Sequence, residues 1–253
     1  MPENELRSPA DQRLATTDIP DPIAFLMNAE PEIEGRMPWS SNATFLVTLR
    51  GDGPDGATVE QRAIYKPVRG ERPLWDFEPG LHKRERAAYL LSERLGIGVV
   101  PPTVIRDGPL GEGSFQWFVD ADHSEHYFTI YEQHDHLHGQ CRDIAVLDIL
   151  ANNTDRKSGH CLLAHDRVWA IDNGLCFSTP YKLRTVIWEF AGESIDDVLL
   201  DRIAPMVERI PVDIAALLAD DEIEAMQRRA AALVTERRLP DEGGDHRYPW
   251  PLI

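Results

Sequence analysis

Apolar and polar positions alternate along the first half of this chain and recur with helical spacing along the second half. Short runs rich in Phe, Thr and Val, bounded by Gly, Asp and Pro turns, predict strands. These runs are residues 43–49, 59–66, 99–106, 114–119 and 127–132. Two early helices are predicted. Residues 21–29 carry a capping Asp and a Pro at the first helical position, and residues 82–95 place Ala and Leu at helical spacing before Gly96.

After about residue 138 the pattern changes. Amphipathic helices are predicted over residues 141–151, 194–207, 211–218 and 221–238. One β-hairpin interrupts them, with strands over residues 161–164 and 168–171 and a turn at Asp166 and Arg167. A β-rich first half with one prominent helix, followed by a mostly helical second half, predicts an α+β, bilobal fold.

The pattern also predicts where one part of the chain passes into the next. The junction between the lobes is expected near residues 132–138. The expected parts are a disordered N-terminal segment (1–20), an N-lobe (21–133), a C-lobe (134–239) and a C-terminal tail (240–253).

The composition of the chain mainly excludes some classes of partner. The 253 residues are 42% hydrophobic and 27% charged, and 43 acidic against 26 basic residues give a net charge of −17. A field of that sign repels nucleic acids and anionic lipid surfaces, so neither is an expected partner. No apolar run reaches bilayer-spanning length, and the polar start resembles no secretion signal, so we expect a cytoplasmic protein. Three cysteines without a CxxC pair predict buried free thiols in a reducing compartment.

The predicted hairpin suggests chemistry because an aspartate stands at each end of it. Asp155 precedes the first strand and Asp172 follows the second, so both carboxylates lie on the same side. Phosphoryl transfer from ATP needs such a pair, one to accept the proton of the attacking hydroxyl and one to hold the metal that bridges the phosphates. The alternative is a surface hairpin with ordinary polar turns, because Asn, Asp and Gly are common turn formers.

Two neighbours of Asp155 refine the hypothesis. Lys157 is close enough to offset charge on the transferred phosphoryl group. His160 stands five positions after Asp155, where an Asn usually completes the metal site in such loops. Magnesium prefers oxygen ligands, whereas imidazole suits softer ions. His160 therefore binds a metal such as Mn²⁺, contacts phosphate, or leaves a second metal position empty.

Lys66 is the candidate phosphate anchor in the first half. It ends a predicted strand, from which its ammonium can reach the α and β phosphates of a nucleotide. Glu85, in the following helix, is the expected carboxylate partner, with Glu71 and Glu93 as competitors. Most lysines are merely exposed, so an ordinary surface Lys66 is the alternative.

Other candidates carry weaker signals. Ser41 and Asn42 precede a predicted strand and are candidates for a phosphate-covering loop, although turn or capping roles explain them equally well. Arg184 and Trp188 follow the Asn-Gly turn as candidates for the substrate side, with a packed interface Trp as the alternative. Five clustered histidines are candidates for a zinc site: His123, His126, His134, His136 and His138. No cysteine accompanies them at finger-like spacing, so solvated histidines are the favoured interpretation.

Taken together, the ordered motifs resemble the phosphatidylinositol 3-/4-kinase superfamily. The similarity is to its type II phosphatidylinositol 4-kinase-like branch, to Hip toxin-type kinases, and still more to a bacterial phosphatidylinositol-kinase-like group without an assigned substrate. It extends over about residues 20–238. The motifs are Lys66-Pro67, the helix with Glu85, Val100-Pro101-Pro102-Thr103, Gly113-Ser114-Phe115-Gln116, Asn153-Thr154-Asp155-Arg156 and Ile171-Asp172-Asn173-Gly174.

This resemblance implies a protein-kinase-like fold with ATP and Mg or Mn as cofactors. It implies phosphate anchoring by Lys66, catalysis by Asp155 and metal ligation by Asp172. The expected reaction is phosphate transfer from ATP to a hydroxyl of an unidentified protein, small molecule or lipid. Because His160 departs from the expected Asn, a nucleotide-binding pseudokinase regulator remains an alternative, as does a nucleotidyl (AMP) transferase.

Overall fold

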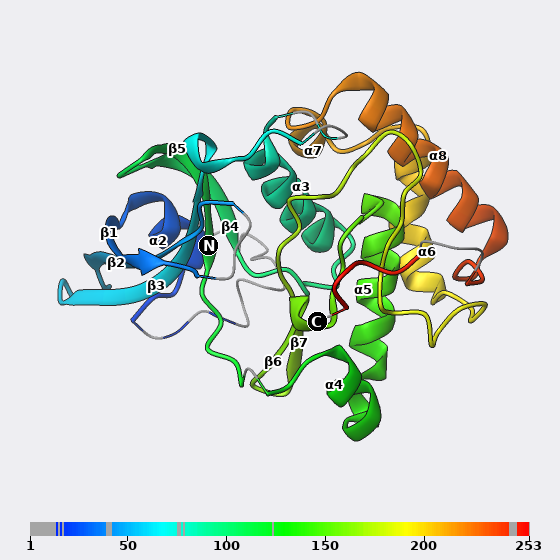
Figure 1. Cartoon of the computed structure of the whole chain (residues 1–253), viewed down its shortest axis with the longest axis horizontal. Coiled ribbons are helices and arrows are strands. Elements are labelled where there is room, and N and C mark those ends of the chain that lie inside the picture. The colour runs from blue at the N-terminus through cyan, green and yellow to red at the C-terminus, as the bar shows by residue number, and fades with distance from the viewer. Residues whose placement is uncertain are drawn as a thin grey trace, which may run out of the picture.

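The first half of the chain forms a five-stranded antiparallel sheet (Figure 1). The computed structural model describes residues 14, 16, 18–38, 42–74, 77, 79–122, 124–242 and 247–252. The strand order is β1-β2-β3-β5-β4. The strands are β1 (Glu30–Arg36), β2 (Phe45–Asp52), β3 (Thr58–Pro67), β4 (Thr103–Gly108) and β5 (Gly111–Trp117).

The two faces of this sheet have different neighbours. Alternation along β3 directs Ala63 and Tyr65 into a core shared with helix α2 (Pro22–Asn28). The intervening side chains, including Lys66, face the opposite way, toward helix α3 (Leu81–Arg94), where Lys66 contacts Glu85. The alternation therefore separates a packed face from a face available for chemistry.

Helices dominate the second half, with the short hairpin of β6 (Cys161–Ala164) and β7 (Arg167–Ala170) among them. None of the described helices is long and apolar enough to cross a membrane. The helices are α4 (Tyr127–Gln133), α5 (His138–Ala151), α6 (Asp197–Ile203), α7 (Val212–Ala215) and α8 (Asp220–Glu236). Single 3₁₀ turns cover Val68–Gly70, Asp135–Leu137, Ser158–His160 and Ala204–Val207.

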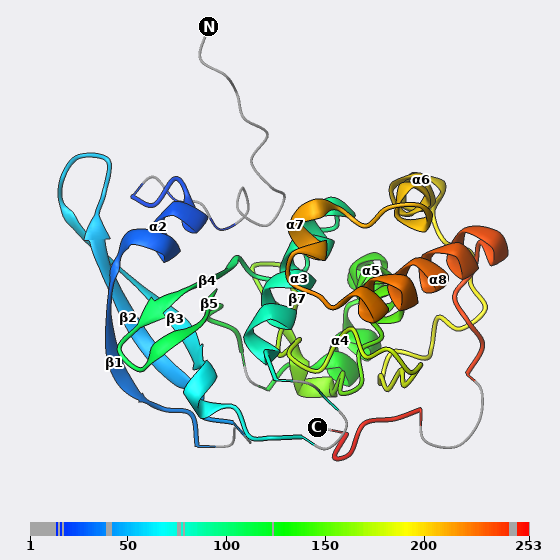
Figure 2. The same cartoon turned by 90° about the horizontal axis from the view of Figure 1, so that it is seen from above.

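Helix α3 connects the two halves. Figures 1 and 2 show the sheet and α2 at one end, helices α5, α6 and α8 toward the other, and α3, with α7 beside it, between them. Residues Ala88, Leu91 and Leu95 of α3 are fully buried in the apolar core of the second half. One side of α3 is thus fixed to the C-lobe core, while Glu85 on the same helix points to the sheet. Lys66 and the C-lobe loops are brought together in this way.

Several predicted elements are confirmed, with small shifts at their ends. Asp21 caps α2 by accepting a hydrogen bond from Ala24 N at 2.9 Å, and Gly96 follows α3 with a φ of +67°. The hairpin is present, but its turn is His165-Asp166, one residue earlier than predicted. Both residues have positive φ, as a two-residue type I′ turn requires. The three cysteines are buried and free, as predicted.

One predicted strand is wrong. Residues 127–132 are rich in aromatic and β-branched residues, which favours a strand, yet Tyr127–Gln133 is helix α4. Thr129 Oγ1 accepts from His126 N at 2.9 Å and so satisfies a free donor at the helix start. Tyr127 and Ile130, three residues apart, are fully buried on one side. Capping and tertiary packing outweigh the strand propensity of this segment.

One further strand and two element starts also differ from the predictions. Strand β1 was not predicted, because its acidic and Pro-containing sequence lacks an apolar face. Strand β4 starts at Thr103, after two prolines, and not at residue 99. The helix predicted from residue 194 starts at Asp197, capped by Asp196, and tightens to a 3₁₀ turn at Ala204 before Pro205.

A buried ion pair organises the loop that follows α5. Arg156 is fully buried and donates from Nε and Nη2 to the Asp148 carboxylate, with a closest distance of 2.9 Å. The guanidinium also donates to Asn173 Oδ1 at 2.6 Å and to Ile171 O at 2.7 Å. This fork joins α5, the loop carrying Asp155, and the turn carrying Asp172.

A close backbone approach near Lys66 gives the first prediction. A Cβ on Gly113 would lie 2.4 Å from Lys66 O and 2.7 Å from Pro67 Cα, so Gly113→Ala must separate β3 from β5. We expect the unfolding free energy to fall by about 1–3 kcal/mol. The matched control is Gly35→Ala in β1, where a Cβ meets nothing within 4 Å. Urea denaturation of both variants checks this, and equal stabilities would contradict it.

The buried pair gives the second prediction. Asp148→Ala leaves Arg156 as an unpaired buried charge, so the unfolding free energy should fall by about 3–5 kcal/mol. The control is Asp197→Ala, which removes an exposed partner of Arg237 and should cost about 1 kcal/mol or less. Thermal and urea unfolding compare the two. A small effect of Asp148→Ala would show that Arg156 does not depend on this carboxylate.

Candidate active site

Lys66 joins three segments that are far apart in sequence. Its ammonium donates to Asp172 Oδ1 at 2.7 Å and to Glu85 Oε1. The Glu85 side chain is buried, whereas the side chains of Lys66 and Asp172 are 23% and 51% exposed. The lysine therefore sits between a buried carboxylate that fixes it and an accessible carboxylate that can take a ligand.

Glu85 has a second contact that fixes the turn holding Asp172. Its Oε2 accepts from Asn173 N at 3.0 Å. A Cβ at Gly174 would lie 3.3 Å from Glu85 Oε1, so glycine allows α3 to approach the turn closely. Asp172 itself has a φ of +56°, a left-handed conformation that is uncommon outside glycine and that Asp tolerates better than most residues. The surrounding contacts hold its carboxylate in place.

Asp155 comes from the loop between α5 and β6. Its backbone N–H donates to Asn153 Oδ1 at 2.9 Å, and Lys157 Nζ lies 3.1 Å from its carboxylate. Burial raises the pKa of Asp155, while the positive charge of Lys157 opposes that shift and the Asp172 carboxylate adds to it. Asp172 is thus close enough to Asp155 to affect its ionisation.

His160 lies between the two aspartates. Its Nδ1 is 2.9 Å from Asp155 O, a pure acceptor, so Nδ1 carries the proton. Burial lowers the pKa of His160 to about 4, although the Asp172 charge opposes the shift, so the ring is neutral near pH 7. The Nε2 lone pair then faces Asp172 Oδ2 at 3.4 Å. Two acceptors that face each other at this distance suit a cation between them.

His160 and Asp172 therefore supply two of the ligands that a metal site needs. No three His, Cys, Asp or Glu side chains in the described ranges gather as a complete metal cluster. His160 Nε2 and Asp172 Oδ2 are two adjacent ligands, and water or phosphate oxygens commonly supply the rest in nucleotide-dependent enzymes. Imidazole with carboxylate favours Mn²⁺ over Mg²⁺.

Charge keeps Lys66 and Asp172 ionised. Burial alone would lower the pKa of Lys66, but the Asp172 and Glu85 carboxylates raise it well above its ordinary value. The ammonium of Lys66 in turn holds the pKa of Asp172 well below its usual range. A cation bound at the other oxygen of Asp172, Oδ2, would weaken the attraction between this carboxylate and the ammonium, which then becomes available to nucleotide phosphates.

Some candidate residues are not part of this cluster. Ser41 lies outside the described residues. Asn42 Oδ1 accepts from Arg72 N at 3.0 Å and so braces the chain after β3. Of the three carboxylates considered for Lys66, Glu85 makes the contact. Glu71 instead contacts the His82 side chain at 3.2 Å and accepts from Gly80 N and His82 N at the start of α3. Burial alone would raise the pKa of Glu71, but these contacts lower it to about 2.

The clustered histidines serve different contacts. His126 Nδ1 is 2.9 Å from Ser158 Oγ, His136 Nε2 is 2.7 Å from Asp166 Oδ1, and His138 Nε2 is 2.9 Å from Tyr131 O. His123 lies outside the described residues. These side chains therefore brace helix α4 and the hairpin and do not converge.

The segment after the Asp172 turn runs beside the catalytic loop. Arg184 O accepts from Arg156 N at 3.0 Å, and Arg184 N donates to Asn153 O at 2.9 Å. Trp188 is buried and its Nε1 donates to Arg247 O at 3.3 Å. Trp188 is therefore a packed residue, the alternative considered above. Near the chain end, Leu252 O accepts from Ser158 N at 2.8 Å, so backbone contacts attach the tail to this loop.

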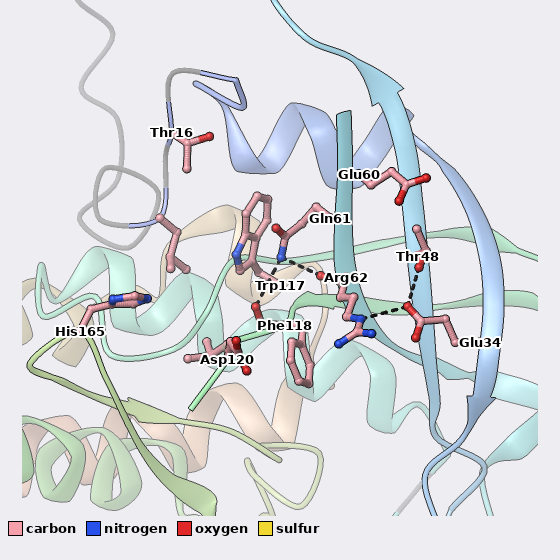
Figure 3. Close-up of a pocket in the computed structure, with 12 residues that line it drawn as sticks. Thr16, Glu34, Thr48, Glu60, Gln61, Arg62, Trp117, Phe118, Asp120 and His165 are labelled. Atoms are coloured by element: carbon pink, nitrogen blue, oxygen red, sulfur yellow. Dashed lines mark hydrogen bonds and ion pairs between the residues drawn. The ribbon is translucent and has the colours of Figure 1, made fainter. Parts of the chain in front are cut away.

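A cavity of about 830 Å³ opens beside the segment that follows β5 (Figure 3). Its lining includes Glu34, Thr48, Arg62, Phe118 and His165. Figure 3 shows Glu34 linked to both Thr48 and Arg62, and Arg62 Nε donates to Glu34 at 3.1 Å. Arg62 and Lys66 share one face of β3, so the cavity and the Lys66 cluster lie along the same side of that strand.

Sequence reasoning missed the residues that hold this arrangement. Asp148 is buried in the middle of an apolar helix, and Asn153 donates from Nδ2 to its Oδ1 at 3.0 Å. The signal was available in principle, because a carboxylate within the run Ala145–Ala151 needs a buried partner. Which arginine supplies that partner depends on tertiary structure.

Comparisons of structure show the fold. A hydra Fam20 structure with sugar shares 14% sequence identity and a TM-score of 0.51, covering 85% of this chain and 86% of that one. The Helicobacter pylori proinflammatory kinase CtkA shares 11% identity and a TM-score of 0.46, covering 84% of this chain and 94% of that one. The likeness to the Fam20 structure, together with the five-stranded sheet and the helical second half, confirms the predicted α+β, bilobal, protein-kinase-like fold.

Comparisons of sequence show the relationship. No family model matches the chain. Protein Rv2133c of Mycobacterium tuberculosis is 37% identical over an alignment 281 positions long, gaps included, which covers 95% of this chain and 98% of that protein. Identity at this level over nearly the full length of both proteins indicates common descent. The chain therefore belongs to the same protein family as Rv2133c.

Proposed function

We propose that the protein is an ATP-dependent phosphotransferase of the phosphatidylinositol 3-/4-kinase-like branch. The observation that carries the proposal is the convergence of Lys66, Glu85 and Asp172, with Asp155 on the adjoining loop. A lysine fixed by a helix carboxylate beside an accessible aspartate is the arrangement that kinases use to hold nucleotide phosphates. The kinase-like fold supports the same conclusion.

The proposed mechanism assigns one task to each side chain. Lys66 binds the α and β phosphates once its contact with Asp172 opens. Asp172 and His160 would hold Mg²⁺ or Mn²⁺, which would neutralise charge on the nucleotide phosphates. Asp155 orients the acceptor hydroxyl and takes its proton, which its raised pKa favours. Lys157, 3.1 Å from Asp155, offsets charge on the transferred phosphoryl group.

The nucleotide base is proposed to lie along the same face of β3. Leu46 and Ile64 are cross-strand partners, both half-buried, and alternation places them on the Lys66 face. They form an apolar surface between Lys66 and the cavity beside Phe118. Flat, largely apolar groups such as adenine bind to surfaces of this kind next to a few backbone polar groups.

The acceptor is proposed to be a hydroxyl of a protein, a small molecule or a lipid headgroup. The net charge of −17 disfavours a stable association with an anionic membrane, so a soluble acceptor fits the electrostatics better.

Some variants should lose nucleotide binding, and others should lose only phosphate transfer. Lys66→Met and Asp172→Asn should weaken binding of ATP with Mn²⁺ at least tenfold, because each loses a direct contact with phosphate or metal. Asp155→Asn should keep binding but reduce phosphate transfer by about 10²–10⁴-fold. Calorimetry measures binding, and labelling from γ-labelled ATP measures transfer. The control is Lys83→Met, an exposed lysine of α3. Unchanged binding in Lys66→Met would contradict the assignment.

A non-catalytic regulator is the second candidate, favoured by His160 at the position of an expected Asn. It predicts nucleotide binding without turnover under any metal. Intact-mass analysis after incubation with ATP and Mn²⁺ or Mg²⁺ separates the possibilities. A mass gain of one phosphoryl group that is lost in Asp155→Ala supports the kinase, and a gain of AMP supports nucleotidyl transfer.

His160 also generates a prediction about metal preference. Replacing imidazole by an amide oxygen in His160→Asn should shift the activity ratio from Mn²⁺ toward Mg²⁺, because Mg²⁺ prefers oxygen ligands. Activity at matched concentrations of each metal measures the ratio. The control is His165→Asn, in the hairpin turn. An unchanged ratio in His160→Asn would remove His160 from the metal site.

A further inference from the structure

A second cavity lies in the C-lobe, away from the Lys66 cluster. Its volume is about 390 Å³, toward the lower end of the roughly 300–1,000 Å³ typical of small-molecule sites. Helix α8 forms one wall. Ile149 of α5, Tyr181 of the segment after the Asp172 turn, and Leu239 near the chain end form the others. Four segments of the chain thus line a mostly apolar space.

A buried arginine lines this cavity without a full set of acceptors. Arg229 of α8 is 7% exposed, and its Nε donates to Leu150 O at 2.8 Å. Its Nη2 is buried and has no hydrogen-bond partner among the described residues. Glu222, a carboxylate whose charge affects Arg229, is itself paired with Arg84 at 2.5 Å. A buried cationic donor without an acceptor is costly, so Arg229 is suited to an anion.

Most of the other charged side chains that line this cavity are also positive. Arg228 and Arg238 line it as well, and their partners Glu224 and Asp241 lie only at 3.8 Å on the exposed surface. One acid, Glu236, also lines it. Burial lowers the pKa of Arg229 to about 10, so the guanidinium remains charged at neutral pH. Three guanidinium groups against one carboxylate favour a negatively charged occupant.

We propose that this cavity is a binding site for a small amphipathic carboxylate, with the carboxylate at Arg229 and an aliphatic or aromatic body against Ile149, Leu233 and Leu239. Guanidinium and carboxylate groups pair through two parallel hydrogen bonds, and Arg229, Arg228 and Arg238 all line this cavity. The apolar walls select against fully hydrated anions such as inorganic phosphate. This inference does not depend on the nucleotide site.

Chain-length-matched probes test the proposal. Octanoate, 1-octanol and octylamine share an apolar tail and differ in head-group charge. Calorimetry with the full chain should show saturable, one-to-one octanoate binding. Octanol should bind at least tenfold more weakly, and octylamine should not bind. Arg229→Met should weaken octanoate binding at least tenfold and leave octanol binding unchanged or tighter. Arg209→Met, an exposed arginine outside the cavity, is the matched control and should behave as wild type.

A second variant keeps the test decisive if Arg229→Met fails to fold. Ala232→Phe places a ring at the exposed mouth of the cavity and leaves Arg229 in place. It should weaken octanoate and octanol alike by at least tenfold, with an unchanged circular dichroism spectrum. Absence of octanoate binding to the wild type would overturn the proposal, as would equal binding by wild type and Ala232→Phe. Either result would make Arg229 a purely structural residue.

Discussion

The contact of Lys66 with both Glu85 and Asp172 is the constraint on which the site depends. It connects the end of β3 to helix α3 and to the turn after β7. These three segments lie far apart in the sequence. The two partners differ in how their second oxygen is held: that of Glu85 is hydrogen-bonded, whereas that of Asp172 faces a lone pair. Glu85 accepts from Asn173 N, and His160 faces the second oxygen of Asp172. Because Glu85 is buried and Asp172 is half exposed, the lysine is anchored on one side and can exchange its partner for a ligand on the other.

The fork of Arg156 sets the geometry on the C-lobe side. A fully buried guanidinium bonded to Asp148, Ile171 O and Asn173 leaves the loop and the turn little freedom to move apart. Such a network is stabilising only when all of its members are satisfied, so its residues act as a unit. The chemistry proposed for Asp155 and Asp172 therefore rests on a scaffold of side chains that touch neither nucleotide nor metal.

Local sequence signals predicted much of this molecule because they act over short distances. Asp21 and Pro22 start α2, the Ala and Leu spacing defines α3, and the hairpin follows from its turn residues. The same signals failed at Tyr127–Gln133, where strand-favouring residues form a helix because Tyr127 and Ile130 find a core on one side. Lys66, Asp155 and Asp172 were identifiable from their positions at element ends. The roles of Asp148, Asn153 and Arg229 were not, since a buried charge reveals its partner only in three dimensions.

The most direct test of the account is a crystal structure with a non-hydrolysable ATP analogue and Mn²⁺, using anomalous scattering to locate the metal. We expect a manganese peak within direct coordination distance of both Asp172 and His160. We also expect that Lys66 Nζ moves from Asp172 to the α or β phosphate while it keeps Glu85. A nucleotide bound elsewhere, or bound with Lys66 still on Asp172 and no metal beside that carboxylate, would contradict the proposed site.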